Sequence, residues 1–179
     1  MPTIILDRDG VINHESKDYI KSPDEWRAID GSLKAIADLK SAGYQIAVAT
    51  NQSGLGRGLF SQATLHAIHR KMIQECKQIG GEFDVIALCP HHPDANCECR
   101  KPKTGLLLAI NAKLRLNPDT DWLIGDTGKD LKAAQQMGIR AALVETGKGS
   151  QEIATGGVSR ETIPVFKNLA HFTSWLLHV

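Results

Sequence analysis

Short unbroken apolar runs and longer periodic stretches take turns along the chain. Ile4, Ile5 and Leu6 follow one another without polar alternation, which is typical of a strand covered by helices on both faces. Similar runs predict strands over residues 44–49, 83–88, 121–124 and 140–144. Apolar spacings of three and four residues predict helices over 32–41, 61–79, 105–116, 131–137 and 169–177. This order predicts an α/β fold, a three-layer Rossmann-like arrangement with a parallel sheet.

Two polar segments interrupt this pattern. Residues 14–26 are too many for a tight turn and too polar for the core, so we expect a loop over the mouth of a site. Residues 146–159 are rich in glycine and predict a mobile surface loop. The spacer between Asp9 and Thr50 holds little more than a loop and one helix. We therefore expect a single domain, residues 1–179, without a large cap domain.

Acidic residues stand where the predicted strands end. Asp7 and Asp9 follow the first strand and Asp126 follows the fourth, so all three would lie at the carboxyl edge of the sheet, where open α/β folds place ligands. Separated carboxylates of this kind suit a hard divalent cation, which predicts Mg²⁺. Asp130 begins the next helix and would cap it or hold a water molecule. The alternative for Asp7 and Asp9 is a solvated turn, because Asp and Gly are common turn residues.

The second and third strands lead into segments suited to anions. Thr50 to Gly58 carries a hydroxyl, amides and three glycines, and Gly-rich turns beside a helix start expose backbone N–H groups to phosphate. A linker is the weaker interpretation. Arg100 and Lys101 precede Pro102 at another corner of the predicted sheet, where fixed cations would bind phosphate; a solvated basic pair is the alternative.

Three of the four cysteines lie within eleven residues. Cys89 and His91, followed by Cys97 and Cys99, place four soft donors in one loop, which predicts a tetrahedral Zn²⁺ site. Four protein ligands leave no open position, so this zinc would be structural. His92 is the alternative to His91, and reduced thiols without metal are the alternative to a zinc site.

Composition narrows the partners and the location. The 179 residues include 21 Lys and Arg against 20 Asp and Glu. Because these charges nearly cancel, the chain has no strong overall electrostatic field, and we expect no nucleic-acid or membrane partner. Any bound anion must be held by residues of a local site. The N-terminus shows no basic and apolar leader, and no apolar run reaches the length of a bilayer. We therefore predict a cytoplasmic monomer, with the remaining cysteine, Cys76, in the core.

The order of these motifs is that of a known superfamily. Asp-x-Asp, Thr-Asn, a basic pair with Lys101 and Gly-Asp resemble the haloacid dehalogenase-like (HAD) phosphohydrolases over nearly the whole chain. Within it, Asp7–Gly10, Thr50–Gly54, Cys99–Pro102 and the cysteine loop resemble the D-glycero-D-manno-heptose 1,7-bisphosphate phosphatase family. Its sister, the histidinol-phosphate phosphatases, is the alternative. Residues 9–13 and 52–54 resemble the heptose bisphosphate phosphatases more than the histidinol-phosphate phosphatases.

The resemblance implies a Mg²⁺-dependent phosphatase that removes the 7-phosphate of a heptose bisphosphate, a step toward lipopolysaccharide. A zinc-stabilised module that binds phosphosugars without turnover is the alternative of another class. Asp7 would be the nucleophile and Asp9 the general acid and base. Asp7, the Asp9 carbonyl and Asp126 would hold Mg²⁺. Thr50 and Lys101 would hold the phosphoryl oxygens, and the substrate contacts would be Arg100, Asn51, Gln52, Ser53, Glu15 and Tyr19. Thr127 stands where many heptose-type members carry Lys.

Overall fold

The computed structural model describes residues 1–178. Its strands are β1 (Thr3–Leu6), β2 (Gln45–Asn51), β3 (Val85–Cys89), β4 (Trp122–Gly125), β5 (Arg140–Val144) and β6 (Val165–Phe166). Its α-helices are α1 (Ser32–Ser41), α2 (Ser53–Gly56), α3 (Gln62–Gln78), α4 (Gly105–Leu114), α5 (Gly128–Met137), α6 (Gly149–Ala154) and α7 (Leu169–His178). Two short 3₁₀ helices, η1 (Pro23–Glu25) and η2 (Pro93–Ala95), lie in loops.

The six strands form one parallel sheet in the order β3-β2-β1-β4-β5-β6. The chain winds outward from β1 to β3, then returns to place β4 on the other side of β1. In open α/β sheets ligands bind outside the carboxyl ends of the strands, at such a reversal of strand order. The predicted α/β fold with a parallel sheet is confirmed, and β1 and β4 mark the expected site.

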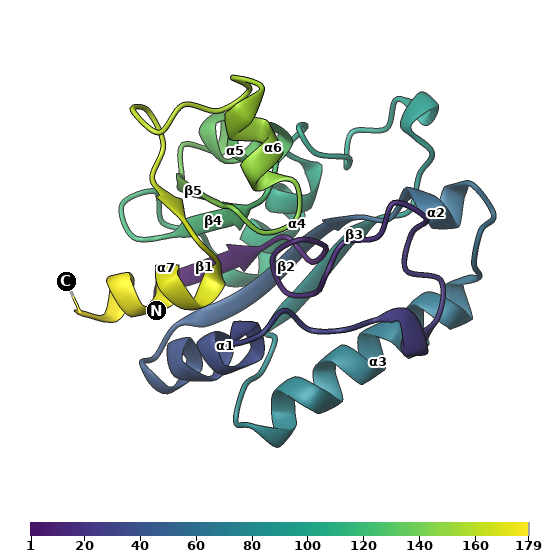
Figure 1. Cartoon of the computed structure of the whole chain (residues 1–179), viewed down its shortest axis with the longest axis horizontal. Helices are drawn as coiled ribbons and strands as arrows, with labels where there is room; N and C mark the ends of the chain where they lie inside the picture. Colours follow the sequence, from purple (N-terminus) through teal and green to yellow (C-terminus); the bar gives the residue numbers. More distant parts are fainter. Residues whose placement is uncertain (179) are drawn as a thin grey trace.

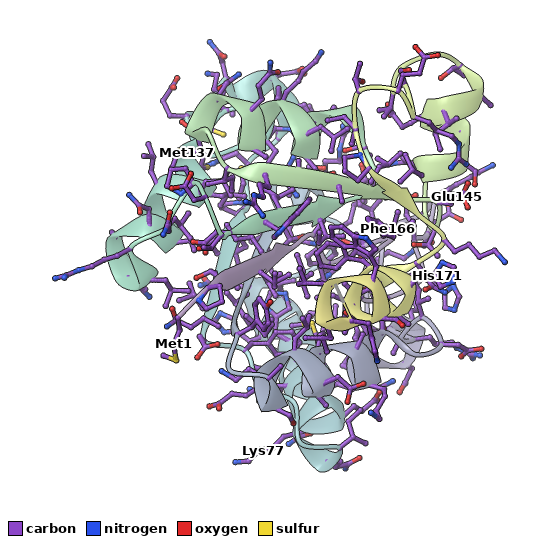
Figure 2. All side chains as sticks on the ribbon, turned by 90° about the vertical axis from the view of Figure 1, so that its left-hand side faces the viewer. Met1, Lys77, Met137, Glu145, Phe166 and His171 are labelled. Atoms are coloured by element: carbon purple, nitrogen blue, oxygen red, sulfur yellow. The ribbon has the colours of Figure 1, made fainter. Side chains whose placement is uncertain are left out.

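Helices cover both faces of the sheet (Figure 1). Helices α1, α3 and α7 pack on one face, and α4 and α5 pack on the other. Successive residues of β1 enter different cores: Ile4 and Leu6 belong to the cluster under α1, α3 and α7, while Ile5 belongs to the cluster under α4 and α5. Both faces of the strand are therefore buried from solvent, which explains its unbroken apolar sequence. Figure 2 shows α7 packed near Phe166 at one end of the sheet.

The structure corrects the prediction for residues 146–159. This segment contains α6, so it is not a continuous loop, although most of it is exposed as predicted. Its N-terminal approach also reaches the strand ends, where the Lys148 N–H donates to Asp126 Oδ2 over 2.9 Å. Helix α6 has only six residues in a Gly-rich sequence, too few for apolar periodicity to reveal it. Strand β6 was also missed, because two residues carry no strand pattern.

The predicted mouth loop is held on α3. Lys71 Nζ donates to the carbonyls of Pro23 and Trp26 over 2.8 and 3.0 Å, and Trp26 is fully buried. Its second half is therefore part of the packed body. Among the described residues, none of the helices has the length and apolar character needed to cross a bilayer.

Candidate active site

A cavity of about 440 Å³ opens at the carboxyl ends of β1, β2 and β4. Nearly all the residues that the sequence predicted for the site line it: Asp7, Asp9, Glu15, Tyr19, Asn51, Gln52, Ser53, Arg100, Lys101 and Asp126. Thr50 does not; it is fully buried, and its hydroxyl accepts a hydrogen bond from the Gln52 amide over 2.8 Å. The cavity also gathers cations that the sequence did not single out, namely Arg8, Lys17, Arg57, Lys129 and Lys148.

Three carboxylates converge at the floor of the cavity. Asp7, Asp126 and Asp130 each present an oxygen within 4.8 Å of the others. Burial raises the pKa of Asp7 to about 7 and that of Asp126 to about 8, and the neighbouring carboxylates add to both shifts. Buried acids at this spacing repel one another when ionised. The arrangement is therefore suited to a divalent cation with oxygen ligands.

Two glycines let the backbone close around Asp126. A Cβ atom at Gly10 would lie 2.2 Å from Asp126 Oδ2, and one at Gly147 would lie 2.1 Å from it. Both glycines also have positive φ angles, +85° and +61°. Any side chain at either position would push Asp126 out of the carboxylate group.

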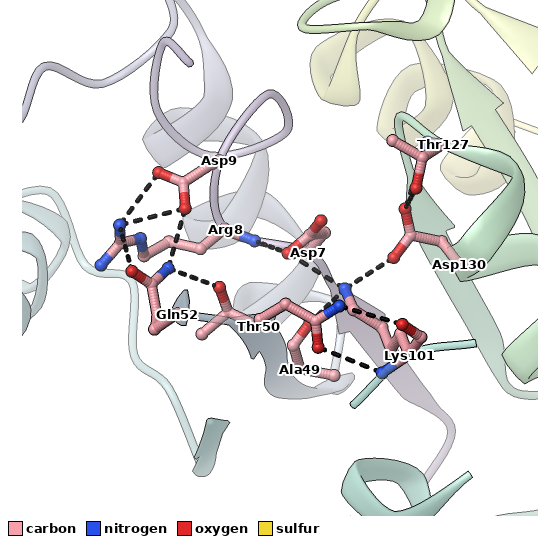
Figure 3. Close-up of polar contacts among 10 residues, drawn as sticks. Asp7, Arg8, Asp9, Ala49, Thr50, Gln52, Lys101, Thr127 and Asp130 are labelled. Carbon is pink, nitrogen blue, oxygen red and sulfur yellow. Dashed lines mark hydrogen bonds and ion pairs between the residues drawn. The ribbon is translucent and has the colours of Figure 1, made fainter. Parts of the chain in front are cut away.

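Lys101 lies between the carboxylates. Its side chain is 2% exposed, and Nζ lies 3.1 Å from Asp7 Oδ1 and 2.6 Å from Asp130 Oδ1, while it donates to the Ala49 carbonyl over 2.6 Å (Figure 3). Burial alone would lower the pKa of Lys101, but the two carboxylates raise it above its ordinary value. Lys101 therefore stays charged beside Asp7.

Asp130 both caps α5 and holds Lys101. Its Oδ2 accepts hydrogen bonds from the N–H and hydroxyl of Thr127 over 3.1 and 2.7 Å, which closes a capping box. The sequence predicted the cap but not the ion pair, because Lys101 and Asp130 are far apart in the chain. Both oxygens of Asp130 are thus engaged, which leaves Asp7 and Asp126 as the freer ligands of the group.

Asp9 points away from Asp7 and Asp130, into a separate network (Figure 3). Arg8 Nη2 donates to both its oxygens over 2.9 and 3.0 Å, Asn13 Nδ2 to Oδ1 over 2.9 Å and Gln52 Nε2 to Oδ2 over 2.8 Å. Burial would raise the pKa of Asp9, but the charge of Arg8 and the hydrogen bonds from Asn13, Arg8 and Gln52 lower it. Asp9 is therefore held ionised in this arrangement.

The mouth loop meets the α6 segment across the cavity. Lys148 Nζ pairs with Glu15 over 2.5 Å, so these two residues link opposite sides of the opening. Arg100 lines the cavity, and its Nη1 is buried without a hydrogen-bond partner among residues 1–178. A buried guanidinium nitrogen is costly unless a ligand accepts from it.

The cysteine–histidine cluster forms beside this site. The Sγ atoms of Cys89, Cys97 and Cys99 lie 3.1–3.5 Å apart, and His91 Nδ1 lies 3.6 Å from Cys89 Sγ and 3.2 Å from Cys99 Sγ. Zinc at ordinary bond lengths would set thiolates about 3.8 Å apart. The four donors thus surround one point, at distances too long for disulfides. His92 lies outside this group and caps η2 instead.

Comparisons with known proteins agree with this geometry. A family model described as HAD-hydrolase-like matches residues 98–172. The D-glycero-beta-D-manno-heptose-1,7-bisphosphate 7-phosphatase of Bordetella bronchiseptica is 48% identical over 99% of this chain and 98% of its own. The enzyme of the same name from Pseudomonas putida is 46% identical over 95% of this chain and 96% of its own. This chain belongs to that phosphatase family.

Solved structures of the family have the same fold. The crystal structure of the B. bronchiseptica D,D-heptose 1,7-bisphosphate phosphatase, complexed with magnesium and phosphate, superposes with a TM-score of 0.94 at 47% identity, covering 99% of this chain and 98% of that one. The enzyme of the same name from Burkholderia thailandensis gives a TM-score of 0.78 at 39% identity over the full length of both. The chain is thus an enzyme, a HAD-family phosphatase that hydrolyses phosphoric monoesters, and not a non-catalytic binding module.

Arg8 and Lys148 are site residues whose contacts the sequence did not reveal, and for Asp130 it revealed the helix cap but not the ion pair with Lys101. Arg8 stands between Asp7 and Asp9, and a cation between two acids is the one signal that could have indicated its role. Lys148 lies in a Gly-rich segment with no motif around it. Its position follows only from the way α6 folds back onto the end of β4.

Proposed function

We propose that this phosphatase removes the 7-phosphate of D-glycero-beta-D-manno-heptose 1,7-bisphosphate through an aspartyl-phosphate intermediate. The observation that carries the proposal is the position of Asp7, beside the buried Lys101 and within reach of Asp126, at the reversal of strand order. The near full-length identity to curated 7-phosphatases supports the choice of substrate.

The reaction divides one displacement into two. In the first step an Asp7 carboxylate oxygen attacks phosphorus and the bond to the sugar oxygen breaks. Asp9, which is ionised in the free site and must bind a proton before this step, then gives that proton to the sugar oxygen. In the second, water attacks the aspartyl phosphate while Asp9 takes up a proton from it, which releases phosphate and restores Asp7. Lys101 would stabilise the phosphoryl oxygens, where negative charge is spread in both transition states. Thr50 is buried behind the cavity lining, but its Oγ1 only accepts from Gln52, so its hydroxyl hydrogen would be available to the same oxygens.

The carboxylate group fits Mg²⁺. We assign its protein ligands to Asp7, Asp126 and the main-chain carbonyl of Asp9, since both oxygens of Asp130 are already engaged. When bound, the cation would neutralise carboxylates that otherwise repel each other and the incoming phosphate. Burial and the neighbouring carboxylates raise the pKa values of Asp7 and Asp126, and a bound cation would favour their ionised forms.

The cysteine–histidine cluster fits a structural Zn²⁺ held by Cys89, His91, Cys97 and Cys99. The loop around it has no apolar core of its own beyond the contacts of Cys97 and Cys99, and it leads directly into Arg100 and Lys101. We infer that the metal fixes this loop and, through it, the two cations.

The substrate would occupy the cavity around Asp7. Arg100 would bind the second phosphate, which would satisfy its unpartnered Nη1. Asn51, Ser53, Glu15 and Tyr19 line the same cavity and would contact the sugar, and Gln52 would act through the Asp9 network it already joins. We further infer a cytoplasmic monomer that acts on small sugar phosphates. Its near-neutral net charge favours neither nucleic acid nor membranes as a partner.

Phosphate release from heptose 1,7-bisphosphate and from histidinol phosphate, each assayed with Mg²⁺, tests the proposal. We expect kcat/KM to favour the bisphosphate by at least about tenfold, a difference of about 1.4 kcal/mol. Asp7→Asn should abolish release from both compounds. A tenfold preference for histidinol phosphate would instead assign the chain to the sister activity.

A further inference from the structure

Arg8 is a fully buried arginine next to the nucleophile. Its side chain is 1% exposed, although arginine is among the residues least often buried. Its main-chain carbonyl accepts from the N–H groups of Ile12 and Asn13 over 2.8 and 3.1 Å, so the backbone turn after β1 fixes it. Burying a charged guanidinium is costly unless its contacts compensate, so the contacts of Arg8 should explain its position.

The guanidinium of Arg8 is held from two sides. Nη1 contacts His69 Nε2 of α3 over 3.3 Å, and Nη2 donates to the Gln52 side-chain oxygen over 3.2 Å. Burial, followed by the charge of Arg8, lowers the pKa of His69 to about 4, so at neutral pH its ring is uncharged and Nε2 accepts. Helix α3 and the end of β2 therefore anchor the arginine.

This anchored group faces Asp9. Arg8 Nη2 bridges both oxygens of Asp9, while Asn13 and Gln52 each donate to one of them. Three donors on two oxygens leave the carboxylate a single orientation. The N–H of Arg8 also donates to Asp7 Oδ1 over 2.7 Å, so one residue contacts both catalytic carboxylates.

We propose that Arg8, anchored by His69, is a positioning residue that orients the Asp9 carboxylate for proton transfer to and from the sugar oxygen and water. The inference rests on the acid–base role proposed for Asp9. Arg8 itself would contact neither substrate nor metal through its side chain, and His69 would act one contact further away, through Arg8.

The test compares two substrates by kcat/KM, which reports the steps up to phosphoryl transfer. Heptose 1,7-bisphosphate has a poor leaving group that needs a proton, whereas p-nitrophenyl phosphate releases a stable phenolate that does not. Arg8→Met should lower kcat/KM at least about 30-fold on the bisphosphate and less than about 3-fold on p-nitrophenyl phosphate. Equal losses on both substrates would overturn the proposal.

A double-mutant cycle gives a second measurement on the bisphosphate alone. If Arg8 acts through Asp9, then Arg8→Met added to Asp9→Ala should cost less than about 3-fold in single-turnover rate. Multiplicative losses would overturn the proposal by assigning Arg8 a general structural role. The wild-type rate distinguishes the two proposals. No phosphate release by the wild type refutes the proposed function, whereas normal wild-type turnover with multiplicative losses in the double variant refutes only the role of Arg8.

His69 supplies a conservative pair. His69→Gln retains an acceptor for Arg8 and should keep the wild-type ratio of the two substrates, whereas His69→Leu should shift the ratio in the direction of Arg8→Met. Leu39→Ala, a core change near the start of β2 at the opposite edge of the sheet, controls for lost stability and should leave the ratio unchanged. A shifted ratio in Leu39→Ala, or equal ratios in both His69 variants, would count against positioning.

Discussion

Neutralising Asp126 should stabilise the metal-free protein while it abolishes the response to magnesium. Asp126 is 2% exposed, and burial together with Asp7 and Asp130 raises its pKa from 3.8 to about 8. A carboxyl group whose pKa is raised on folding destabilises the native state at every pH above the unfolded value. Stability should therefore increase as the pH falls from about 8 toward 4. Asp126→Asn removes this cost and keeps an acceptor for the Lys148 N–H.

The expected gain in unfolding free energy follows from the interval between the ordinary pKa of the carboxyl, 3.8, and the pH of the assay. At pH 7 about three pKa units contribute, each worth about 1.4 kcal/mol, so about 4 kcal/mol is an upper value. The titration is shared with Asp7, and we therefore expect about 2–4 kcal/mol. For a chain of this length 1 kcal/mol corresponds to about 2–4 °C in Tm. Metal-free Asp126→Asn should melt about 4–16 °C above the metal-free wild type.

The assay is thermal unfolding at pH 7 over a magnesium titration, after dialysis against a chelator too weak to remove zinc. Saturating Mg²⁺ should stabilise the wild type by about 2–3 kcal/mol at a hundredfold excess over Kd and leave Asp126→Asn nearly unchanged. Asp121→Asn is the matched control. Asp121 is buried at the other end of β4, where it accepts from the N–H groups of Thr3 and Asn117, so its loss should lower Tm but preserve the magnesium shift.

If metal-free Asp126→Asn melted below the wild type and shifted equally with magnesium, the carboxylates would not form a cation site. The same outcome would show that burial and the neighbouring carboxylates do not raise the pKa of Asp126 as described.

Three further predictions concern other parts of the molecule. Lys101→Met should lower kcat about 10³-fold and destabilise the fold by about 3–5 kcal/mol in urea unfolding, because Asp7 and Asp130 lose their buried cation. Stripping zinc should expose the cluster thiols, but not Cys76, to a thiol reagent and lower Tm much more than magnesium removal does; equal shifts would contradict separate structural and catalytic metals. His69 has its pKa lowered to about 4, so the unfolded chain binds more protons between pH 6.5 and 4 and the native state loses up to about 3 kcal/mol over that range. His69→Gln should lose correspondingly less stability on acidification, and parallel curves for both proteins would refute this.

Local features of the sequence determined most of the fold. Three consecutive aliphatic residues indicated a strand covered on both faces, and the structure places Ile5 in one core and its neighbours in the other. The donors of the cysteine–histidine cluster lie within eleven residues, so one short loop could bring them together without help from the rest of the chain. In both cases the relevant contacts are set by residue type over a few positions.

Tertiary structure decided how the carboxylates are paired. Asp126 lies near Asp7 because β1 and β4 are neighbours in register, with Leu6 opposite Ile124, and strand pairing across more than a hundred residues leaves no trace in either segment. The same holds for the Lys101–Asp130 pair and for α6, whose approach brings Lys148 to the cavity. Residue types could indicate which groups gather at the cavity, because that depends on composition at strand ends. Their orientation, including that of Asp9 on Arg8, depends on long-range packing and is determined only in the folded chain.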